Sequence, residues 1–226
     1  MSIAVGVGLG TQQARQWSHT GVGGAQTSHH LLPEIQALMA QAGLRFDDLD
    51  AIAFGAGPGS FTGLRTACAV AQGLGFAAGK PLLAVDSLLA LAEEARALAG
   101  APQAMRVLAL LDARMDEMYA GNYEFNSNKW TPTVPKRLVR PENLGDTGGW
   151  TLAGNVFAAY GPRLPALAVP TVQAGPTASA MLRLAPALMA AGGAVSAAQA
   201  LPLYIRDKVA QTTDERAAQR LAAATP

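Results

Sequence analysis

The sequence predicts an α/β fold built from two unequal halves. Along residues 1–100, apolar segments of strand length alternate with segments of helix length, an alternation typical of sheets that contain parallel strands. Hydrophobic residues make up 50% of the 226 residues, which is enough for a sizeable core. A short stretch with Gly and Pro at residues 100–103 separates the two halves.

The first half is predicted to open with two strands and to continue with alternating helices and strands. Apolar residues recur at helical spacing from Leu31 to a stop at Gly43, and the next helix ends at Gly79. The predicted strands cover residues 2–7, 13–19, 50–55 and 81–85, and the predicted helices cover residues 28–42, 62–78 and 87–98.

The second half is predicted to be another α/β unit. A strand over residues 106–111 precedes a hairpin of residues 118–125 and 129–139, which turns at Asn126-Ser127-Asn128. Further predicted elements are a short helix over 141–144, a strand over 151–154, a helix over 177–191, an extended piece over 203–206 and an Ala-rich helix over 213–223. We therefore expect one lobe over residues 1–100, a second over 101–206, and a C-terminal helix or tail over 207–226.

Charged residues are scarce in this chain. They make up 15% of it, against about 25% in ordinary globular domains. The 17 basic and 16 acidic side chains leave a formal net charge of +1. This balance excludes a strong global attraction to nucleic acid or to an anionic membrane, and the low charge predicts that a partner covers part of the surface.

The sequence predicts a cytoplasmic protein without a membrane segment. A single cysteine, Cys68, excludes an intrachain disulfide, which suits a reducing compartment. The apolar run over residues 3–9 lacks the basic flank of a signal peptide. The uncharged stretch between Arg183 and Arg206 is interrupted by Pro186 and Gly192-Gly193, so it predicts two shorter pieces.

The predicted helix over residues 62–78 is apolar on all sides. Beyond its first turn, Gln72 is its only strongly polar side chain. Ala67, Ala71 and Gly75 are spaced by four residues, so another helix could approach them closely. A partner chain would explain this composition, and so would burial within a larger core of the same chain.

A glycine-rich loop connects the strand over residues 50–55 to this helix. Unpaired backbone amides and the positive end of a helix dipole lie at such a junction. The loop matches neither the Walker pattern nor G-x-G-x-x-G, so it predicts either a tight turn or an anion site. The residues concerned are Gly57, Pro58, Gly59, Ser60, Phe61, Thr62, Gly63 and Arg65.

The sequence offers no catalytic or metal-binding constellation. The histidines are His19, His29 and His30, and their spacing predicts no metal site. A pairing of His19 with Ser60 would be needed for a peptidase-like activity. Asp112 ends a predicted strand, where it is either a turn residue that binds nearby backbone amides or a carboxylate beside a ligand.

Four stretches together resemble the TsaB family, also called YeaZ. GPGSFTGLR at residues 57–65 resembles the family signature, and SHHLLP at residues 28–33 resembles the stretch before its first long helix. LDARMDEMY at residues 111–119 and PLYIR at residues 202–206 resemble two later family motifs. The resemblance covers nearly the whole chain. It implies a two-lobed actin-like, RNase H-like (ASKHA) fold.

The resemblance also implies a function. TsaB proteins are non-catalytic paralogues of TsaD, the catalytic subunit that forms N6-threonylcarbamoyladenosine at position 37 of tRNAs that read codons beginning with A. The implied partners are TsaD and the ATPase TsaE, with tRNA bound only through the complex and a homodimer when TsaD is absent. No cofactor is expected on this chain alone, although ATP or ADP could lie at its boundary with TsaD.

The implied contact with TsaD uses the helices over residues 28–42 and 62–78. We expect this interface to contain Leu32, Ile35, Met39, Ala67, Cys68, Ala71 and Gly75. On this interpretation, Ala71→Arg or Gly75→Arg removes binding to TsaD while the chain stays folded.

The sequence departs from the family pattern at its start. Family members open with a strand that ends in a D-T-S/T-type segment, ahead of a strand like residues 2–7 here. Without that strand, residues 2–7 would lack an inner neighbour in the sheet, and we expect a truncated chain or a start further upstream. The missing first-strand carboxylate also disfavours the rival interpretation, a small actin-like phosphotransferase or nucleotide hydrolase that uses the glycine loop and Asp112.

Overall fold

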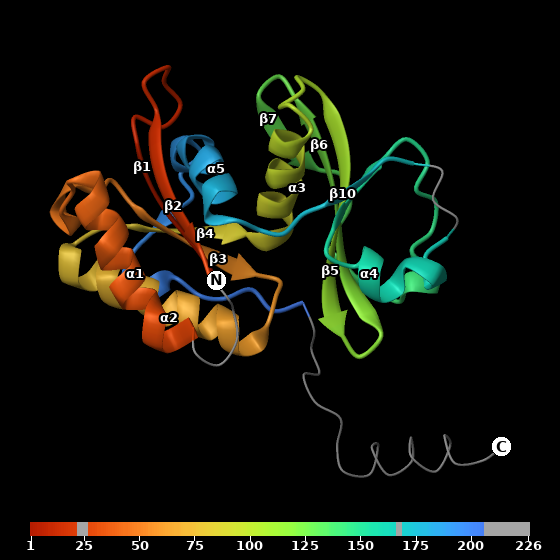
Figure 1. Cartoon of the computed structure of the whole chain (residues 1–226), viewed down its shortest axis with the longest axis horizontal. Coiled ribbons are helices and arrows are strands. Elements are labelled where there is room, and N and C mark those ends of the chain that lie inside the picture. The colour runs from red at the N-terminus through yellow and green to blue at the C-terminus, as the bar shows by residue number, and fades with distance from the viewer. Residues whose placement is uncertain (22–26, 166–168, 206–226) are drawn as a thin grey trace, which may run out of the picture.

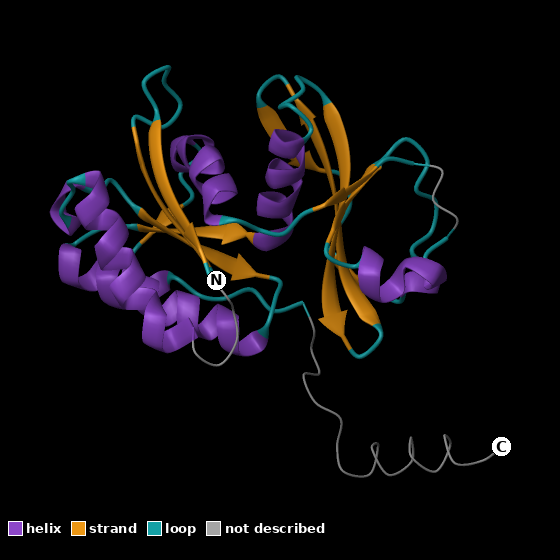
Figure 2. Cartoon of the chain, viewed as in Figure 1, coloured by secondary structure: helices purple, strands orange, loops and turns teal. Residues whose placement is uncertain are grey.

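The computed structural model describes residues 1–21, 27–165 and 169–205 as two α/β lobes side by side (Figure 1). The predicted helix over residues 213–223 lies outside the described residues. In Figure 2 the strands form the inner layers of the two lobes and the helices cover them. No helix in the described ranges is long and apolar enough to span a membrane.

The first lobe contains two small sheets. Strands β1 (Ser2–Val7) and β2 (Arg15–Thr20) form an antiparallel pair. Strand β3 (Ile52–Gly57) runs parallel to β4 (Leu82–Asp86), and the short β11 (Ala194–Val195) pairs with β4 in the antiparallel sense. The helices of this lobe are α1 (Thr27–Ala42), α2 (Phe61–Ala78), α3 (Ser87–Leu98) and α5 (Ala178–Ala190).

Helices cover both faces of these sheets because alternate residues of each strand point to opposite sides. On one side, Ile3 and Val5 of β1 pack against Leu38 and Met39 of α1. Phe54 of β3 packs in the same way against α2. On the other side, α5 contacts both β1 and β3. Helix α5 therefore bridges the two sheets.

The two sheets do not join. Strand β1 pairs with β2 and β3 pairs with β4, and no strand of the described ranges lies between β1 and β3. This confirms, for the described residues, that the strand over residues 2–7 has no inner neighbour. One edge of β1 and one edge of β3 have no paired strand in these ranges, although the Ala56 carbonyl of β3 accepts a hydrogen bond from the Leu203 amide.

The second lobe is a six-stranded sheet with the order β10-β9-β5-β6-β7, and β8 pairs with β6. Its strands are β5 (Met105–Arg114), β6 (Glu117–Asn126), β7 (Lys129–Pro132), β8 (Arg137–Val139), β9 (Thr151–Gly154) and β10 (Thr171–Gln173). Helix α3 covers one face, where Leu88 and Leu91 meet Val107 and Tyr123. The short helix α4 (Phe157–Tyr160) covers the other face.

Two expectations about organisation need correction. Residues 178–195 were expected in the second lobe, but α5 packs on the first-lobe sheets and β11 extends one of them. The predicted strand over residues 129–139 is two strands, β7 and β8, separated by residues 133–136. Pro135 lies within this break, and proline cannot donate a ladder hydrogen bond.

Candidate functional site

The signature loop links β3 to α2 through a tight backbone turn. The Gly57–Pro58 peptide bond is cis, and Gly57 has a φ of 128°, which only glycine adopts without strain. A Cβ atom at Gly57 would also overlap the carbonyl oxygen of Leu203. The prediction of a tight turn is therefore confirmed, and Gly57 is required by both conformation and space.

The first turn of α2 faces outward. Ser60 is the cap residue, but its side chain makes no capping hydrogen bond. Phe61, Thr62 and Gly63 are exposed. The amides at this end thus have no side-chain cap from Ser60, and the anion-site alternative stays a prediction.

An exposed aromatic cluster lies beside this turn. The guanidinium carbon of Arg65 is 3.9 Å from the ring centroid of Phe61. The Arg65 Nε donates to the hydroxyl of Tyr204 at 3.1 Å, and the Phe61 and Tyr204 rings lie 5.6 Å apart. The chain segment around Tyr204 is therefore held against the start of α2, a contact that no local sequence pattern indicates.

The structure overturns part of the predicted partner interface. Cys68, Ala71 and Gly75 are buried against the chain's own β3 and β4, and a Cβ atom at Gly75 would come within 2.6 Å of Leu82 Cδ2. Met39 is likewise buried, in the cluster that α1 forms with β1. These small residues permit a close approach, but the element that approaches is the sheet of the same chain.

The remaining predicted interface residues are accessible to different degrees. Leu32 is exposed, whereas Ile35 and Ala67 are half-buried. The side of α2 that does face outward carries other residues, which we call the outer face of α2: Arg65, Ala69, Gly73, Phe76 and Ala77. Phe76 is 85% exposed, an unusual position for a phenylalanine.

Asp112 has the role of a turn residue. Its Oδ1 accepts hydrogen bonds from the Arg114 amide at 2.8 Å and from the Tyr160 hydroxyl at 2.9 Å. Arg114, Met115 and Asp116 all have a φ near 60°, which is rare outside glycine, and Asp112 helps to hold this turn. Burial and the hydrogen bond to Asp112 raise the pKa of Tyr160 to about 12.

A second cluster lies at the same sheet edge as the signature loop. Asp86 ends β4 and pairs in register with Gly57, so both residues stand at the carboxyl ends of parallel strands, where ligands of α/β sheets often bind. The Asp86 Oδ2 accepts from the Tyr123 hydroxyl and from Lys136 Nζ, both at 2.8 Å. Its Oδ1 caps α3 by accepting from the Leu88 amide at 2.9 Å.

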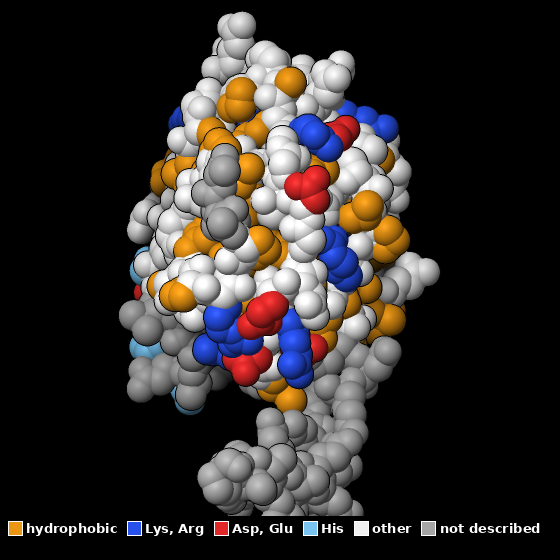
Figure 3. Space-filling view, turned by 90° about the vertical axis from the view of Figure 1, so that its right-hand side faces the viewer, with side chains coloured by type: hydrophobic (Ala, Val, Ile, Leu, Met, Phe, Trp, Pro, Cys, Tyr) orange, Lys and Arg blue, Asp and Glu red, His pale blue; other side chains and the backbone are white. Residues whose placement is uncertain are grey.

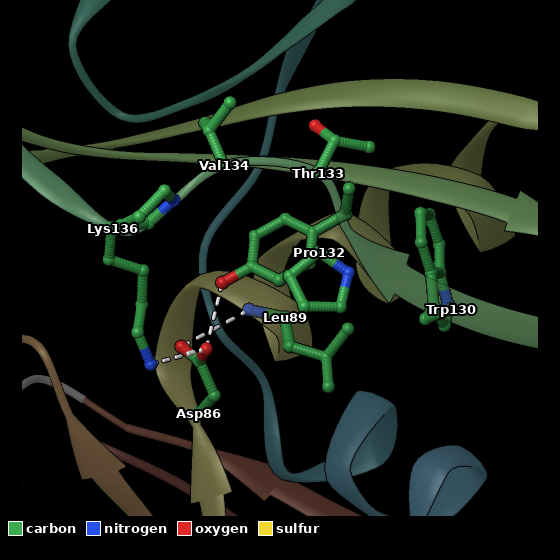
Figure 4. Close-up of a pocket in the computed structure, with 9 residues that line it drawn as sticks. Asp86, Leu89, Trp130, Pro132, Thr133, Val134 and Lys136 are labelled. Atoms are coloured by element: carbon green, nitrogen blue, oxygen red, sulfur yellow. Dashed lines mark hydrogen bonds and ion pairs between the residues drawn. The ribbon is translucent and has the colours of Figure 1, made fainter.

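This cluster lines a pocket between the two lobes (Figure 4). The pocket has a volume of about 450 Å³ and is lined by Asp86, Leu89, Tyr123, Trp130, Pro132, Thr133, Val134, Pro135 and Lys136. Burial, followed by the charge and hydrogen bond of Asp86, raises the pKa of Tyr123. No candidate site residue predicted from the sequence lies among the residues that line this pocket.

Charges of both signs are intermixed over the second lobe. Figure 3 shows acidic and basic side chains next to one another in small groups, with apolar side chains between them. Among the charged side chains of this lobe, Arg163 Nη1 lies 2.9 Å from Asp116 Oδ1, and Arg163 Nε also pairs with Glu142. Within the described ranges, no three His, Cys, Asp or Glu side chains are grouped as a metal site would need.

Comparisons with known proteins identify similar chains. A family model described as "TsaD: tRNA N6-adenosine threonylcarbamoyltransferase" matches residues 14–226. The tRNA threonylcarbamoyladenosine biosynthesis protein TsaB of Escherichia coli (strain K12) is 33% identical over 193 residues, which are 81% of this chain and 82% of that protein. The protein of the same name from Haemophilus influenzae is 33% identical over 198 residues, or 82% and 83% of the two chains.

Solved structures agree with these relatives. YeaZ from Pseudomonas aeruginosa is 37% identical, superposes with a TM-score of 0.78, and covers 90% of this chain and 94% of its own. A second structure, titled as an uncharacterized protein with similarity to peptidase YEAZ from the same organism, has a TM-score of 0.79 at 37% identity and covers 91% and 94%.

Proposed function

Because the chain belongs to the TsaB (YeaZ) family, and so takes part in threonylcarbamoyladenosine biosynthesis in tRNA, we propose that it acts there as a non-catalytic subunit that dimerises with TsaD. The modification would be placed at position 37 of tRNAs that read codons beginning with A. The work of this chain would be to activate TsaD through contact, in the cytoplasm.

The outer face of α2 is the observation that carries this proposal. Ala69 and Gly73 are exposed and small, one turn apart, so a helix of another chain can approach closely. Phe76 stands 85% exposed on the same face, and Leu32 of α1 is 44% exposed. An exposed apolar face of this kind is typical of a protein interaction site.

Ala69→Arg is expected to abolish co-elution with the cognate TsaD while the chain stays folded. The arginine would be accommodated in free solvent in the single chain, but it would be an unpaired charge in an apolar interface. Such a charge weakens binding by about 2 kcal/mol or more, which is roughly thirtyfold in Kd. Size-exclusion chromatography and isothermal titration calorimetry against TsaD measure the effect.

Ala187→Arg is the matched control, because Ala187 is also an exposed alanine on a long helix, α5. This variant should bind TsaD as the wild type does. Unimpaired binding by Ala69→Arg, together with an unchanged rate of tRNA modification in the reconstituted system, would disprove the interface. Equal loss in both variants would do the same.

In this proposal, a nucleotide binds at the boundary between this chain and TsaD. The uncapped, outward-facing start of α2 fits a phosphate there, whereas Asp112 is engaged by Arg114 and Tyr160. Calorimetric titration of ATP should therefore give no binding heat with the isolated chain and a measurable heat with the complex. Tight binding by the isolated chain, with turnover lost in Asp112→Ala, would support the phosphotransferase or hydrolase alternative instead.

The other partners, TsaE and tRNA, would bind through the complex of this chain with TsaD. The near-neutral net charge of +1 and the intermixed charges of Figure 3 favour tRNA and TsaE binding through the assembly, not through this chain alone. In the absence of TsaD, the outer faces of two copies would pair as a homodimer. A homodimer by itself would thus leave the proposal standing.

A further inference from the structure

We propose that the pocket beside Asp86 binds a small organic anion with a flat apolar body, such as an aromatic carboxylate. The pocket opens between α3 of the first lobe and the β7–β8 connection of the second lobe. Its volume of about 450 Å³ lies within the range of about 300 to 1,000 Å³ that is usual for small-molecule sites. This site is separate from the outer face of α2 and from the turn held by Asp112.

The walls of the pocket fit an apolar body. Leu89, Trp130, Pro132, Val134 and Pro135 line it from both lobes. The Trp130 ring is held in place, because its Nε1 donates to the buried Glu93 carboxylate at 2.9 Å. A rigid aromatic wall flanked by prolines favours a flat ligand over a flexible chain.

One end of the pocket fits an anionic group. Lys136 is the one cation among the residues that line the pocket, and its side chain is 28% exposed. An ammonium group has three N–H donors, and within the described part of the chain Lys136 Nζ gives one of them, to Asp86. Figure 4 shows Lys136 reaching across to Asp86 from the β7–β8 connection. Among the described residues its other donors have no hydrogen-bond acceptor, so a ligand can accept from them.

Asp86 holds Lys136 in position without making the pocket strongly negative. Its Oδ1 accepts from the Leu88 and Leu89 amides at 2.9 and 3.4 Å, and its Oδ2 accepts from Tyr123 and Lys136. The positive N-terminal end of α3 adds to these donors. A carboxylate satisfied in this way orients the ammonium group and repels a ligand anion only weakly.

Nuclear magnetic resonance on the full chain tests the site directly. The probe is indole-3-acetate, compared with the uncharged indole-3-acetamide. The side-chain indole N–H resonance of Trp130 should shift saturably with a Kd below about 1 mM, while those of Trp17 and Trp150 stay in place. Indole-3-acetamide should bind about tenfold more weakly, since it can accept a hydrogen bond from the Lys136 ammonium group but lacks the opposite charge of the carboxylate. A shift common to all three tryptophans, or no shift, would overturn the proposal.

Two variants and a control separate the ligand site from general stability. Lys136→Met should weaken binding of indole-3-acetate about ten- to a hundredfold, whereas Lys129→Met, at the exposed start of β7, should leave it unchanged. Val134→Trp should block the site by filling it, with the ion pair between Lys136 and Asp86 kept. Wild-type affinity in both Lys136→Met and Val134→Trp would refute the site, and far-ultraviolet circular dichroism confirms that each variant is folded.

Discussion

Replacing Glu93 with alanine should lower the free energy of unfolding by about 3 kcal/mol, at the lower end of the range for a broken buried ion pair. The Glu93 side chain is 3% exposed and belongs to α3, which lies between the two lobes. Its removal would take the acceptor from the Trp130 indole and one partner from each of two arginines, Arg96 and Arg183, which would keep their hydrogen bonds to Pro102 and Glu94. Few other single substitutions of a charged residue in this chain should cost as much.

The contacts of Glu93 explain the size of this expected loss in the free energy of unfolding. Its Oε2 accepts from Arg96 Nε and from Trp130 Nε1, both at 2.9 Å, and its Oε1 accepts from Arg183 Nε at 2.9 Å. These donors come from α3, β7 and α5, so one carboxylate joins the second-lobe sheet to a helix of the first lobe. Burial alone would raise the pKa of Glu93, but the bonds from Arg96, Trp130 and Arg183 outweigh it and lower that pKa.

Urea denaturation followed by tryptophan fluorescence measures the effect. The matched control is Glu124→Ala, because Glu124 also pairs with an arginine, Arg106, but both side chains are over 40% exposed at 44% and 49%. Such a pair contributes less than about 1 kcal/mol. Equal losses in Glu93→Ala and Glu124→Ala would contradict the role assigned to Glu93.

The lowered pKa of Glu93 adds a pH dependence with a definite sign. A carboxyl group whose folded-state pKa lies below its ordinary value of 4.5 contributes stability above that pH, and the contribution is lost as the pH falls through the folded-state pKa. The stability difference between wild type and Glu93→Gln should therefore hold steady above pH 5, approximately, and shrink at lower pH. A difference that grows on acidification would show that Glu93 is not the group responsible.

Sequence patterns predicted most helices and strands of the fold, but not which lobe the C-terminal helix α5 packs against. Elements with a clear apolar run or stop residue, such as β3 and α2, which ends before Gly79, lie within a few residues of their predicted bounds. The placement of α5 on the first lobe depends on contacts with β1 and β3, which are far away in the sequence. Its apolar face predicts that α5 is covered, and says nothing about which sheet covers it.

The candidate sites likewise divide into one that local sequence predicts and one that depends on residues far apart in the chain. The signature string located the turn at Gly57, because its glycines and proline have local conformational reasons to be there. The pocket depends on Asp86 and Lys136, which are fifty positions apart and meet through an ion pair of 2.8 Å. Neither residue belongs to a motif whose spacing could have indicated this ion pair.

Ala71→Arg and Gly75→Arg should unfold the chain instead of only blocking a partner. Small residues spaced by four predict a close neighbour, and the structure identifies that neighbour as the chain's own sheet. Ala71 is 4% exposed, so an arginine there would bury a charge without a partner. The expected loss exceeds about 4 kcal/mol, a large part of the usual stability of 5 to 15 kcal/mol.

Thermal unfolding of Ala71→Arg beside Ala69→Arg tests this difference within one helix. The two positions are two residues apart, so they lie on opposite sides of α2, and Ala69 is exposed where Ala71 is buried. Ala69→Arg should keep a cooperative transition near that of the wild type, and Ala71→Arg should lose it or express as insoluble protein. A folded Ala71→Arg variant that no longer binds TsaD would contradict this expectation and return Ala71 to the interface.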